Sequence, residues 1–529
     1  MGQAPTRQLQ RIRRLIRQGR RKHAGRALRR LLTRVPNQPE AWFELGHLSE
    51  GPQAEQRLTA LGWYRRASYF NPRLPQVWYR MGLLYEQSSL FRDAIFAFGA
   101  YLRLRPESTS QHVYLHLAQA LSRLKYEGSA VQFYLKALEA EQSNPLILFS
   151  LSQSLQKLGD LDLALDSLMA LGRLYPAKLD LVSLLMGNLL EKQGESIAAR
   201  QCYDEALRRQ PRQLFWQLKR DLVYPLIPEN RADIETSAAG IEAALAQALD
   251  RLRHQPVQLP HEHFFYLAMM HGNIAYTAYH HTDALRQRQL LAELIRRSLA
   301  KPPAWQPSVS GPRLHLGIIA AAKSVALSFI YTSAMADRLD PARFQVTIFC
   351  QSPDVAQLFK SSSRYHFHGS HVSWKLISDD PHQALAQVRA SRLDAMFFTE
   401  PGWDFQQYIL ALFRVAPVQC TSWMNPGTSG IATMDYFLSA AMMEPTGSEN
   451  QYSEHLERWR AFPSWVPAFD FPAPAPREDF GLADGWHLYA CLQNLLKVHP
   501  DLDLLIGEIL RRDPQGRLLM VSTPERQHL

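Results

Sequence analysis

The chain of 529 residues has little cysteine and no long apolar run. Its four cysteines are Cys202, Cys350, Cys420 and Cys491. Because they lie far apart and form no C-x-x-C pair, the sequence favours buried thiols over a disulfide framework or a zinc site. No stretch approaches the roughly 18 to 20 apolar residues that a membrane-spanning helix needs, and no signal-peptide pattern opens the chain. We expect a cytoplasmic protein without a membrane span.

Acidic residues are absent from residues 1–34, which contain twelve Lys and Arg, whereas the rest of the chain has 47 basic and 49 acidic residues. A segment of this kind can bind nucleic acid, anionic lipid or an acidic protein, and it also resembles a transit peptide. Apolar residues recur in it at helical spacing: Leu9, Ile12, Leu15, Ile16, Ala24, Ala27, Leu28, Leu31 and Leu32. We therefore favour a solvated, basic pair of helices. Nucleic acid is the less favoured partner because no recognised nucleic-acid-binding fold accompanies the charge.

Residues 39–211 repeat at intervals of 34 to 36 residues, most visibly at Ala94, Ala130, Ala164 and Ala198. Small residues recur where paired helices must approach closely, at Gly82, Ala118, Ser152 and Gly187. Prolines follow each second helix, at Pro72, Pro106, Pro145, Pro176 and Pro211. The period and the unit that starts at Trp78 resemble a tetratricopeptide array. Residues 6–36 add a further unit around Gly19, which makes about six, and such an array leaves a groove for a peptide or a partner protein.

An aromatic set and a histidine set could each be mistaken for a cofactor site. The first is better explained by packing between helices, and the second by residues without a shared function. The aromatic set falls at helical spacing and is expected to pack between helices: Trp42, Trp63, Tyr64, Trp78, Tyr79, Tyr85 and Phe91. The histidine set lacks thiolate or carboxylate companions: His261, His263, His271, His280, His281 and the HFHGSH run from His366 to His371. A helical metal pair needs a spacing of three or four residues. We expect no metal.

The pattern changes at Leu314 from helical periodicity to alternating strands and helices. Apolar runs start at Leu314, Phe344, Leu393 and Pro417, and a helix is expected over 325–339. This alternation predicts a doubly wound parallel sheet, in which ligands lie beyond the carboxyl ends of the strands. Two loops follow such ends, EPGWD at 400–404 and NPGTSG at 425–430.

Four segments carry a more specific resemblance: RLDAMFFTEPGWD, APVQCTSWMNPGTSGIATMDYFLS, ENQYSEHLERW and YACLQNLLKVHPDLDLLIGEIL. Together with the repeats they resemble bacterial relatives of the protein O-linked N-acetylglucosamine transferases and the Spindly proteins. The resemblance implies an α plus α/β fold, in which a tetratricopeptide α-solenoid precedes a two-lobed, GT-B-like glycosyltransferase module. Five regions are expected. Residues 1–38 form a basic helical pair that is expected to be the first repeat, 39–211 form the repeats, and 212–312 form a helical transition and a linker. Residues 313–484 form the first lobe of the transferase, and 485–529 form the start of its donor-binding lobe.

The family transfers a sugar from a UDP-sugar to a Ser or Thr hydroxyl with inversion and without a metal, so the resemblance also implies site residues. The acceptor and sugar loop is Pro426, Gly427, Thr428, Ser429 and Gly430. Its glycines let the backbone approach a sugar, and its hydroxyl and amide groups can donate hydrogen bonds. Taken alone, the same residues also suit a tight turn. Lys497 matches the family lysine that contacts the diphosphate, and Gln493 the glutamine beside the nucleotide.

Two departures from the family pattern bear on activity. The loop after the first strand reads AAAKSVALSF from Ala320, with Ala326 where the first family histidine is expected, so no catalytic residue is assigned. The second lobe is incomplete, since about 45 residues are too few for an independent core. Asp404 and Asp435 lie near the expected cleft, and Asp435 is better explained as anchoring a strand than as a base.

The preferred function is a protein O-glycosyltransferase that uses N-acetylglucosamine or another hexose on a protein held by the repeats. The alternative is a non-catalytic scaffold with a degenerate or incomplete transferase module. The retained NPGTSG and QNLLK motifs favour the first, and the missing histidine and the short second lobe favour the second. The sequence leaves the sugar, the protein substrate and self-association open.

Overall fold

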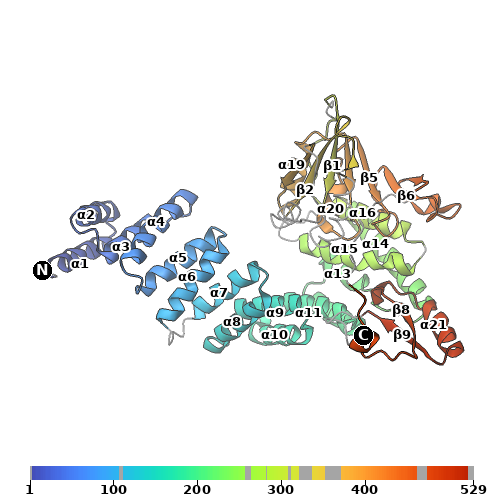
Figure 1. The fold of residues 1–529 in the computed structure, drawn as a ribbon, viewed down its shortest axis with the longest axis horizontal. Coiled ribbons are helices and arrows are strands. Elements are labelled where there is room, and N and C mark those ends of the chain that lie inside the picture. Colours follow the sequence, from blue (N-terminus) through green and yellow to red (C-terminus); the bar gives the residue numbers. More distant parts are fainter. Residues whose placement is uncertain are drawn as a thin grey trace. The chain divides into compact units, whose positions relative to one another are not determined.

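The computed structural model describes residues 3–105, 111–256, 264–281, 283–307, 311–320, 336, 338–351, 371–461 and 473–521. The chain forms two compact units, Met1–Leu189 and Leu190–Leu529. Each unit is described by itself, with its elements labelled in Figure 1. Among the described helices, none is long and apolar enough to cross a bilayer. The five finer domain boundaries expected from the sequence stay predictions.

The first unit is an array of helices in which each packs against the next along the chain (Figure 1). The helices are α1 Gln3–Arg17, α2 Arg21–Arg34, α3 Pro39–Ser49, α4 Ala54–Phe70, α5 Pro75–Gln87, α6 Phe91–Leu104, α7 Gln111–Arg123, α8 Glu127–Ala140, α9 Pro145–Leu158 and α10 Leu161–Leu174. A 3₁₀ turn, Pro176–Lys178, leads into α11 Leu179–Gln193, in which the boundary between the units falls. The predicted solenoid of helix pairs is confirmed.

The basic helices α1 and α2 bury their apolar residues and expose their charges. Leu9, Ile12, Ala24 and Leu28 are each at most 4% exposed, whereas most Arg and Lys side chains of the two helices are exposed. Gly19 turns the chain between the helices with φ +74°. The predicted solvated pair of helices is confirmed.

A regular register of small and large residues builds the repeat core. A fully buried alanine lies in the second helix of each helix pair, that is, of each repeat: Ala24, Ala60, Ala94, Ala130, Ala164 and Ala199. Four residues later the same helix face carries a large side chain that is at most 2% exposed: Leu28, Tyr64, Phe98, Tyr134, Leu168 and Tyr203. The predicted position Ala198 is wrong by one residue, because the last interval has one residue more and the half-buried Ala198 precedes the buried Ala199.

Glycines in the first helices make room for these large side chains. A Cβ atom on Gly82 would lie 2.5 Å from Cε1 of Phe98, and one on Gly46 would lie 2.6 Å from Cε1 of Tyr64. The aromatic residues accordingly pack between helices, and the rings of Trp42 and Trp63 stack at 5.3 Å. Both the small-residue prediction and the aromatic-packing prediction are confirmed here.

The Gly82→Ala variant is expected to unfold more easily than the wild type by about 1 to 2 kcal/mol. Overpacking a tight contact costs about 1 to 3 kcal/mol, which exceeds the gain of up to about 1 kcal/mol from replacing glycine in a helix. Gly99→Ala in α6 is the matched control, because its Cβ meets nothing within 4 Å and only the gain remains. Urea unfolding should give changes of opposite sign, and equal changes would contradict the proposed ring contact.

The second unit begins with helices and continues into a sheet. Its helices before the sheet are α12 Ser196–Arg209, α13 Leu214–Asp221, α14 Arg231–His254, α15 Phe264–His280 and α16 Leu285–Ser298. Contacts join α13 to α14 and α15, and α14 to α16. The two amphipathic stretches expected in this region correspond to α14 and α16.

Seven parallel strands form the sheet of this unit in the order β3-β2-β1-β4-β5-β6-β7. They are β1 Leu314–Ile319, β2 Phe344–Cys350, β3 Val372–Leu376, β4 Ala395–Phe398, β5 Val418–Ser422, β6 Tyr436–Ala440 and β7 His455–Trp459. The described helices between them are α19 Pro381–Arg389 and α20 Phe405–Ala411, with a 3₁₀ turn at Ser448–Gln451. The expected helix over 325–339 lies almost wholly outside the described residues.

Both faces of the sheet are buried, as a doubly wound sheet requires. Phe349 and Phe398 point into a core shared with α13–α16, α19 and α20. Their neighbours Ile348 and Phe397 point into the core on the opposite face. Successive strand residues alternate between the two faces, which explains why the sequence shows continuous apolar runs here.

A small β-α-β segment ends the described chain. It contains β8 His487–Cys491, a 3₁₀ turn η5 Leu495–Lys497, α21 Asp501–Arg512 and β9 Gly516–Met520, preceded by a 3₁₀ turn at Arg477–Phe480. Strands β8 and β9 pair in parallel and form a sheet of their own. The predicted strand and helix after Tyr489 are confirmed.

Candidate functional site

The 400–404 loop (Glu400–Asp404) and the 425–430 loop (Asn425–Gly430) follow β4 and β5 at the carboxyl edge of the sheet. Strand β1 has β2 on one side and β4 on the other, so the direction of strand order reverses beside β4. Ligands of such sheets bind at this switch point. The amide of Gly402 donates to Asn425 Oδ1 at 2.6 Å, and this bond joins the two loops.

The segment that follows β1, residues 321–335, lies outside the described residues. Ala326 and nearly all of the AAAKSVALSF segment belong to it. The expected lack of a family histidine there therefore stays a sequence-based prediction.

The 425–430 loop is held by one buried carboxylate, Glu454, which is 5% exposed. The Thr428 hydroxyl donates to Glu454 Oε2 at 2.6 Å, and the Ser429 amide donates to Oε1 at 2.8 Å. The Ser429 hydroxyl donates to the same Oε1 atom. The hydroxyls proposed to meet a sugar are thus engaged inside the chain, and Thr428 and Ser429 are 5% and 2% exposed. Pro426 and Gly427 are the half-buried members of the loop.

Glycine is required at three places in these loops, and one of them is Gly427, which has φ +85°. Gly430 has φ +71°, and a Cβ atom there would lie 2.5 Å from the backbone carbon of Arg288. At Gly402 a Cβ atom would lie 2.2 Å from Asn425 Oδ1. Of the two glycines predicted to allow a close approach, Gly430 lies close to the backbone of Arg288, a residue of the protein itself, whereas a Cβ atom on Gly427 would meet nothing within 4 Å.

Arg288 of α16 lies beneath both loops and is 5% exposed. Its Nη2 donates to the carbonyl of Pro426 at 3.4 Å, and its Nε has no hydrogen-bond partner among the described residues. Burial lowers the pKa of the guanidinium, while nearby Tyr408 and Glu454 act in the opposite direction. Sequence reasoning missed this residue. One signal was available in the sequence. Arg288 lies three residues before Leu291 and seven before Ile295, and this spacing places a cation on the apolar face of an amphipathic helix.

Lys497, the expected diphosphate contact, lies against the 400–404 loop. Its Nζ is 4.7 Å from the ring centroid of Tyr279 and 5.6 Å from that of Trp403. Cations are attracted to aromatic faces at such distances, and Trp403 is further held by Tyr276, with ring centroids 5.1 Å apart. Gln493 is exposed, and its Oε1 accepts a hydrogen bond from the Asn494 amide at 3.0 Å. The 400–404 loop thus contacts both the 425–430 loop and Lys497.

Both acidic residues near the cleft have structural roles. Asp404 caps α20 by accepting a hydrogen bond from the Gln407 amide at 2.9 Å. Asp435 pairs with Arg414 and accepts from the Gln419 amide at 2.7 Å, so the prediction that it anchors a strand is confirmed.

Three of the described histidines contact groups other than histidine. His271 Nε2 lies 3.2 Å from the carbonyl oxygen of Pro401, and His371 Nε2 lies 3.1 Å from that of Ala336. His280 pairs with the Tyr224 hydroxyl at 3.2 Å, and burial lowers its pKa. His261, His263 and residues 366–370 lie outside the described residues.

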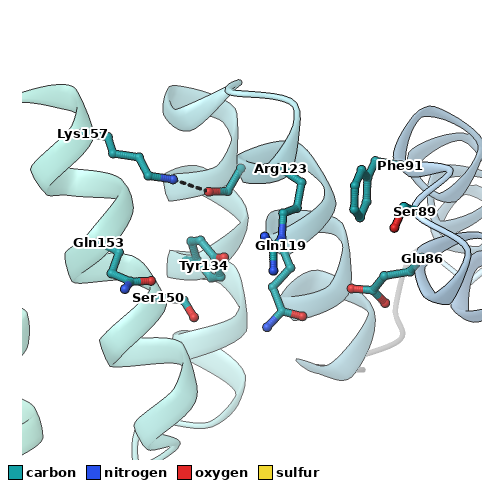
Figure 2. A pocket seen from close by; sticks show the side chains of 10 residues that line it. Glu86, Ser89, Phe91, Gln119, Arg123, Tyr134, Ser150, Gln153 and Lys157 are labelled. Atoms are coloured by element: carbon teal, nitrogen blue, oxygen red, sulfur yellow. Dashed lines mark hydrogen bonds between the residues drawn. The ribbon is translucent and has the colours of Figure 1, made fainter. Parts of the chain in front are cut away.

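The repeat unit has a candidate site of its own, a cavity of about 660 Å³ lined by α5 to α9 (Figure 2). Gln119 and Gln153 occupy the same position of consecutive repeats, and Arg123 and Lys157 stand four residues after them. Lys157 is paired with Glu127 at 2.7 Å, whereas Arg123 is exposed and has no partner among the described residues. The cavity therefore presents amides and a cation on the first helices of two units.

Comparison with known proteins agrees with the repeat register. A tetratricopeptide repeat model matches residues 5–48, and a second such model matches residues 111–144 and 182–213. A protein of Solanum lycopersicum named as a probable UDP-N-acetylglucosamine–peptide N-acetylglucosaminyltransferase SPINDLY is 27% identical over 150 residues. Its counterpart from Petunia hybrida is 26% identical over 150 residues. Each match covers 27% of this chain and 16% of the relative, so the chain matches only a small part of either protein.

Among solved structures, an O-GlcNAc transferase mutant of Thermobaculum terrenum is 19% identical, with a TM-score of 0.47. The alignment covers 79% of this chain and 69% of that one.

The fold and site define a class of protein in which helical repeats precede a doubly wound parallel sheet with loops gathered at its carboxyl edge. The chain contains tetratricopeptide repeats, and about a quarter of it is similar to the Spindly proteins.

Proposed function

We propose that this chain is a glycosyltransferase that transfers N-acetylglucosamine or another hexose from a UDP-sugar to Ser or Thr hydroxyls of a protein bound by the repeats. The observation that carries the proposal is the position of the 400–404 loop, which contacts Asn425 on one side and Lys497 on the other. Two motifs separated by about 70 residues in sequence thereby meet at one edge of the sheet, where ligands of this fold class bind.

The proposed reaction is a displacement at the anomeric carbon of the sugar. The acceptor hydroxyl forms a bond to that carbon, the bond to the diphosphate breaks, and the hydroxyl proton leaves with solvent or a base that the described residues do not identify. The ammonium of Lys497 would offset negative charge on the departing UDP, a role for which a fixed cation is well suited. The proposal includes no metal. The role of the 425–430 loop is to place its backbone beside the sugar.

The repeat cavity supports a protein as the acceptor. Amide side chains such as those of Gln119 and Gln153 can donate to and accept from a peptide backbone. Their repetition at one position of consecutive units suits an extended chain, which presents peptide groups at regular intervals. Arg123 would favour an acidic residue nearby.

One observation favours the alternative, a non-catalytic scaffold. Every polar group of Thr428 and Ser429 that could donate to a sugar already donates to Glu454, apart from the Thr428 amide. Lys497 is likewise held over two aromatic rings. A scaffold would use these internal contacts as they stand, whereas a transferase would need at least one of these groups to reach its substrate as well.

Binding of UDP to the full chain, measured by calorimetry, tests the proposal. We expect saturable binding that weakens at least about tenfold in Lys497→Ala, because the variant loses a charge-assisted contact to phosphate. Lys375→Ala is the matched control, since Lys375 bonds Ser391 at 2.9 Å near the far edge of the sheet. UDP-N-acetylglucosamine serves as the second ligand.

A folded chain that binds no UDP at millimolar concentration would refute the transferase and leave the scaffold. Equal UDP binding by wild type and Lys497→Ala would show that the donor site lies elsewhere.

A further inference from the structure

A second cavity, of about 530 Å³, lies between α14, α16 and the segment that leaves the 425–430 loop. Arg286, Gln289, Glu293 and Arg296 line it from α16, at a spacing of three, four and three residues that places them on one helix face. Arg253 lines it from α14. Lys497 and the 400–404 loop are not part of its wall, so it is distinct from the proposed donor site.

Positive charge exceeds negative charge in this cavity. Glu293 accepts hydrogen bonds from Arg296 at 2.8 and 2.9 Å and another from Arg297, so its charge is already compensated. Arg253 and Arg286 have no hydrogen bond or ion pair with any residue that the structure describes, and both are exposed to solvent. Two guanidinium groups therefore stand uncompensated in one concave wall.

The rest of the wall is largely apolar. Leu249, Leu290 and Leu412 contribute to it, and Ile431 and Ala432 close the side next to the 425–430 loop. A volume of this size falls within the roughly 300 to 1,000 Å³ that is usual for small-molecule sites, and such sites combine an apolar lining with a few polar anchors. A ligand with a charged head and an apolar body fits both features.

We propose that this cavity binds an organic phosphate monoester. Such a group carries a charge of about −1.5 to −2 at pH 7, which matches the two uncompensated arginines. Guanidinium forks also bond phosphate oxygens in pairs. The apolar wall holds the organic part of the ligand. Gln289 and the exposed Ser453, which also line the cavity, supply neutral hydrogen-bonding groups.

The site touches the segment that carries the candidate sugar loop. The wall includes Gly430, the last residue of that loop, and Ser453, whose hydroxyl lies 3.0 Å from that of Thr428. A phosphate monoester bound in this cavity would therefore lie beside the segment that Glu454 holds.

Calorimetric titration of the full chain with phenyl phosphate, inorganic phosphate and benzoate tests the site. We expect submillimolar binding of phenyl phosphate, with inorganic phosphate and benzoate each at least about tenfold weaker. The double variant Arg253→Gln/Arg286→Gln should bind phenyl phosphate at least about thirtyfold more weakly, because each lost charge-assisted contact reduces affinity by roughly sixfold or more. Arg212→Gln, an exposed arginine that does not line the cavity, should bind like the wild type.

A second variant adds a negative charge to the cavity instead of removing positive charges. Ala432 is exposed and lines the cavity, so Ala432→Glu introduces a carboxylate without disturbing a core. It should weaken phenyl phosphate binding at least about tenfold through like-charge repulsion, and its melting temperature should stay that of the wild type.

Three results would overturn the proposal: no binding of phenyl phosphate by the folded wild type at 10 mM, about the highest practical concentration, binding unchanged in the double variant, or benzoate binding as tightly as phenyl phosphate. Inorganic phosphate binding as tightly as phenyl phosphate would overturn the assignment of an organic body. UDP binding by the double variant is expected to equal that of the wild type, which separates this site from the donor site.

Discussion

Replacing Lys219 with methionine is expected to lower the free energy of unfolding of the second unit by about 3 to 5 kcal/mol, the usual cost of leaving one member of a buried ion pair alone. Lys219 in α13 is 3% exposed, and its Nζ lies 2.5 Å from Glu191 Oε2. Glu191 is 8% exposed and also accepts a hydrogen bond from the Tyr203 hydroxyl at 2.5 Å. Without the lysine, the buried carboxylate loses a cation that lies in direct contact with it.

The measurement is hydrogen exchange of the amides in α12 and α13, with urea unfolding of the full chain beside it. Exchange should accelerate in both helices of the Lys219→Met variant. Two further variants test whether the loss comes from the broken ion pair. The double variant Glu191→Leu/Lys219→Met should recover part of the loss, because apolar residues of similar volume replace a buried pair at little cost, while the Tyr203 hydroxyl loses its acceptor.

The second control variant is Arg208→Met, which breaks an exposed ion pair with Glu205 and should lower the free energy of unfolding by less than about 1 kcal/mol. A Lys219→Met variant no less stable than Arg208→Met would contradict the buried ion pair. A double variant as unstable as Lys219→Met would show that packing, and not the unpaired charge, causes the loss.

The Glu454→Ala variant is expected to release the 425–430 loop and to abolish any transferase activity of the chain. Three donors lose their acceptor at once, and each unsatisfied buried donor costs about 1 to 3 kcal/mol. The resulting loss of stability is about 3 kcal/mol or more. Hydrogen exchange at Ser429 should report it directly, because its amide donates to Glu454 Oε1 at 2.8 Å.

Glu457→Ala in β7, the strand that follows Glu454, is the matched control, since the side chain of Glu457 is 47% exposed and lies 3.9 Å from His455 Nε2. It should change stability by less than about 0.5 kcal/mol. Glu454→Gln should fall between the two, because a side-chain amide keeps one acceptor for the Ser429 amide. Slow exchange at Ser429 in Glu454→Ala would show that the carboxylate does not hold the loop.

Features that repeat along the chain could be predicted from the sequence, and single contacts could not. The helix pairs follow from periodicity, as do the small residues opposite large ones, because the same contact recurs in every unit. Ala198 was wrong by one residue because the period itself varies by a residue or two. Apolar strands β1, β2, β4 and β5 were recognised, whereas β3 and β7 were missed since their residues are mostly half-buried or exposed.

The candidate site shows the same division. The 425–430 loop and Lys497 could be selected from motifs, and the structure places each beside the 400–404 loop. Glu454 and Arg288, which hold the 425–430 loop, could not be selected, because they lie 24 residues after it and 137 residues before it. Their importance arises only when the chain folds them beneath one turn. The assignment of sugar-binding and UDP-binding roles stays a prediction.

The regular register of the repeats has a consequence for how this chain can change by inheritance. The two helices of a repeat meet through the same arrangement at Gly46 and at Gly82, where a small residue in the first helix lies beside a large one four residues after a buried alanine in the second. A duplication or deletion of one whole repeat therefore leaves this contact unchanged in the remaining repeats, and changes only the length of the array. Loss of a few residues within a helix rotates its apolar face away from both neighbours. Related chains should consequently differ in repeat number far more readily than in the length of any one helix.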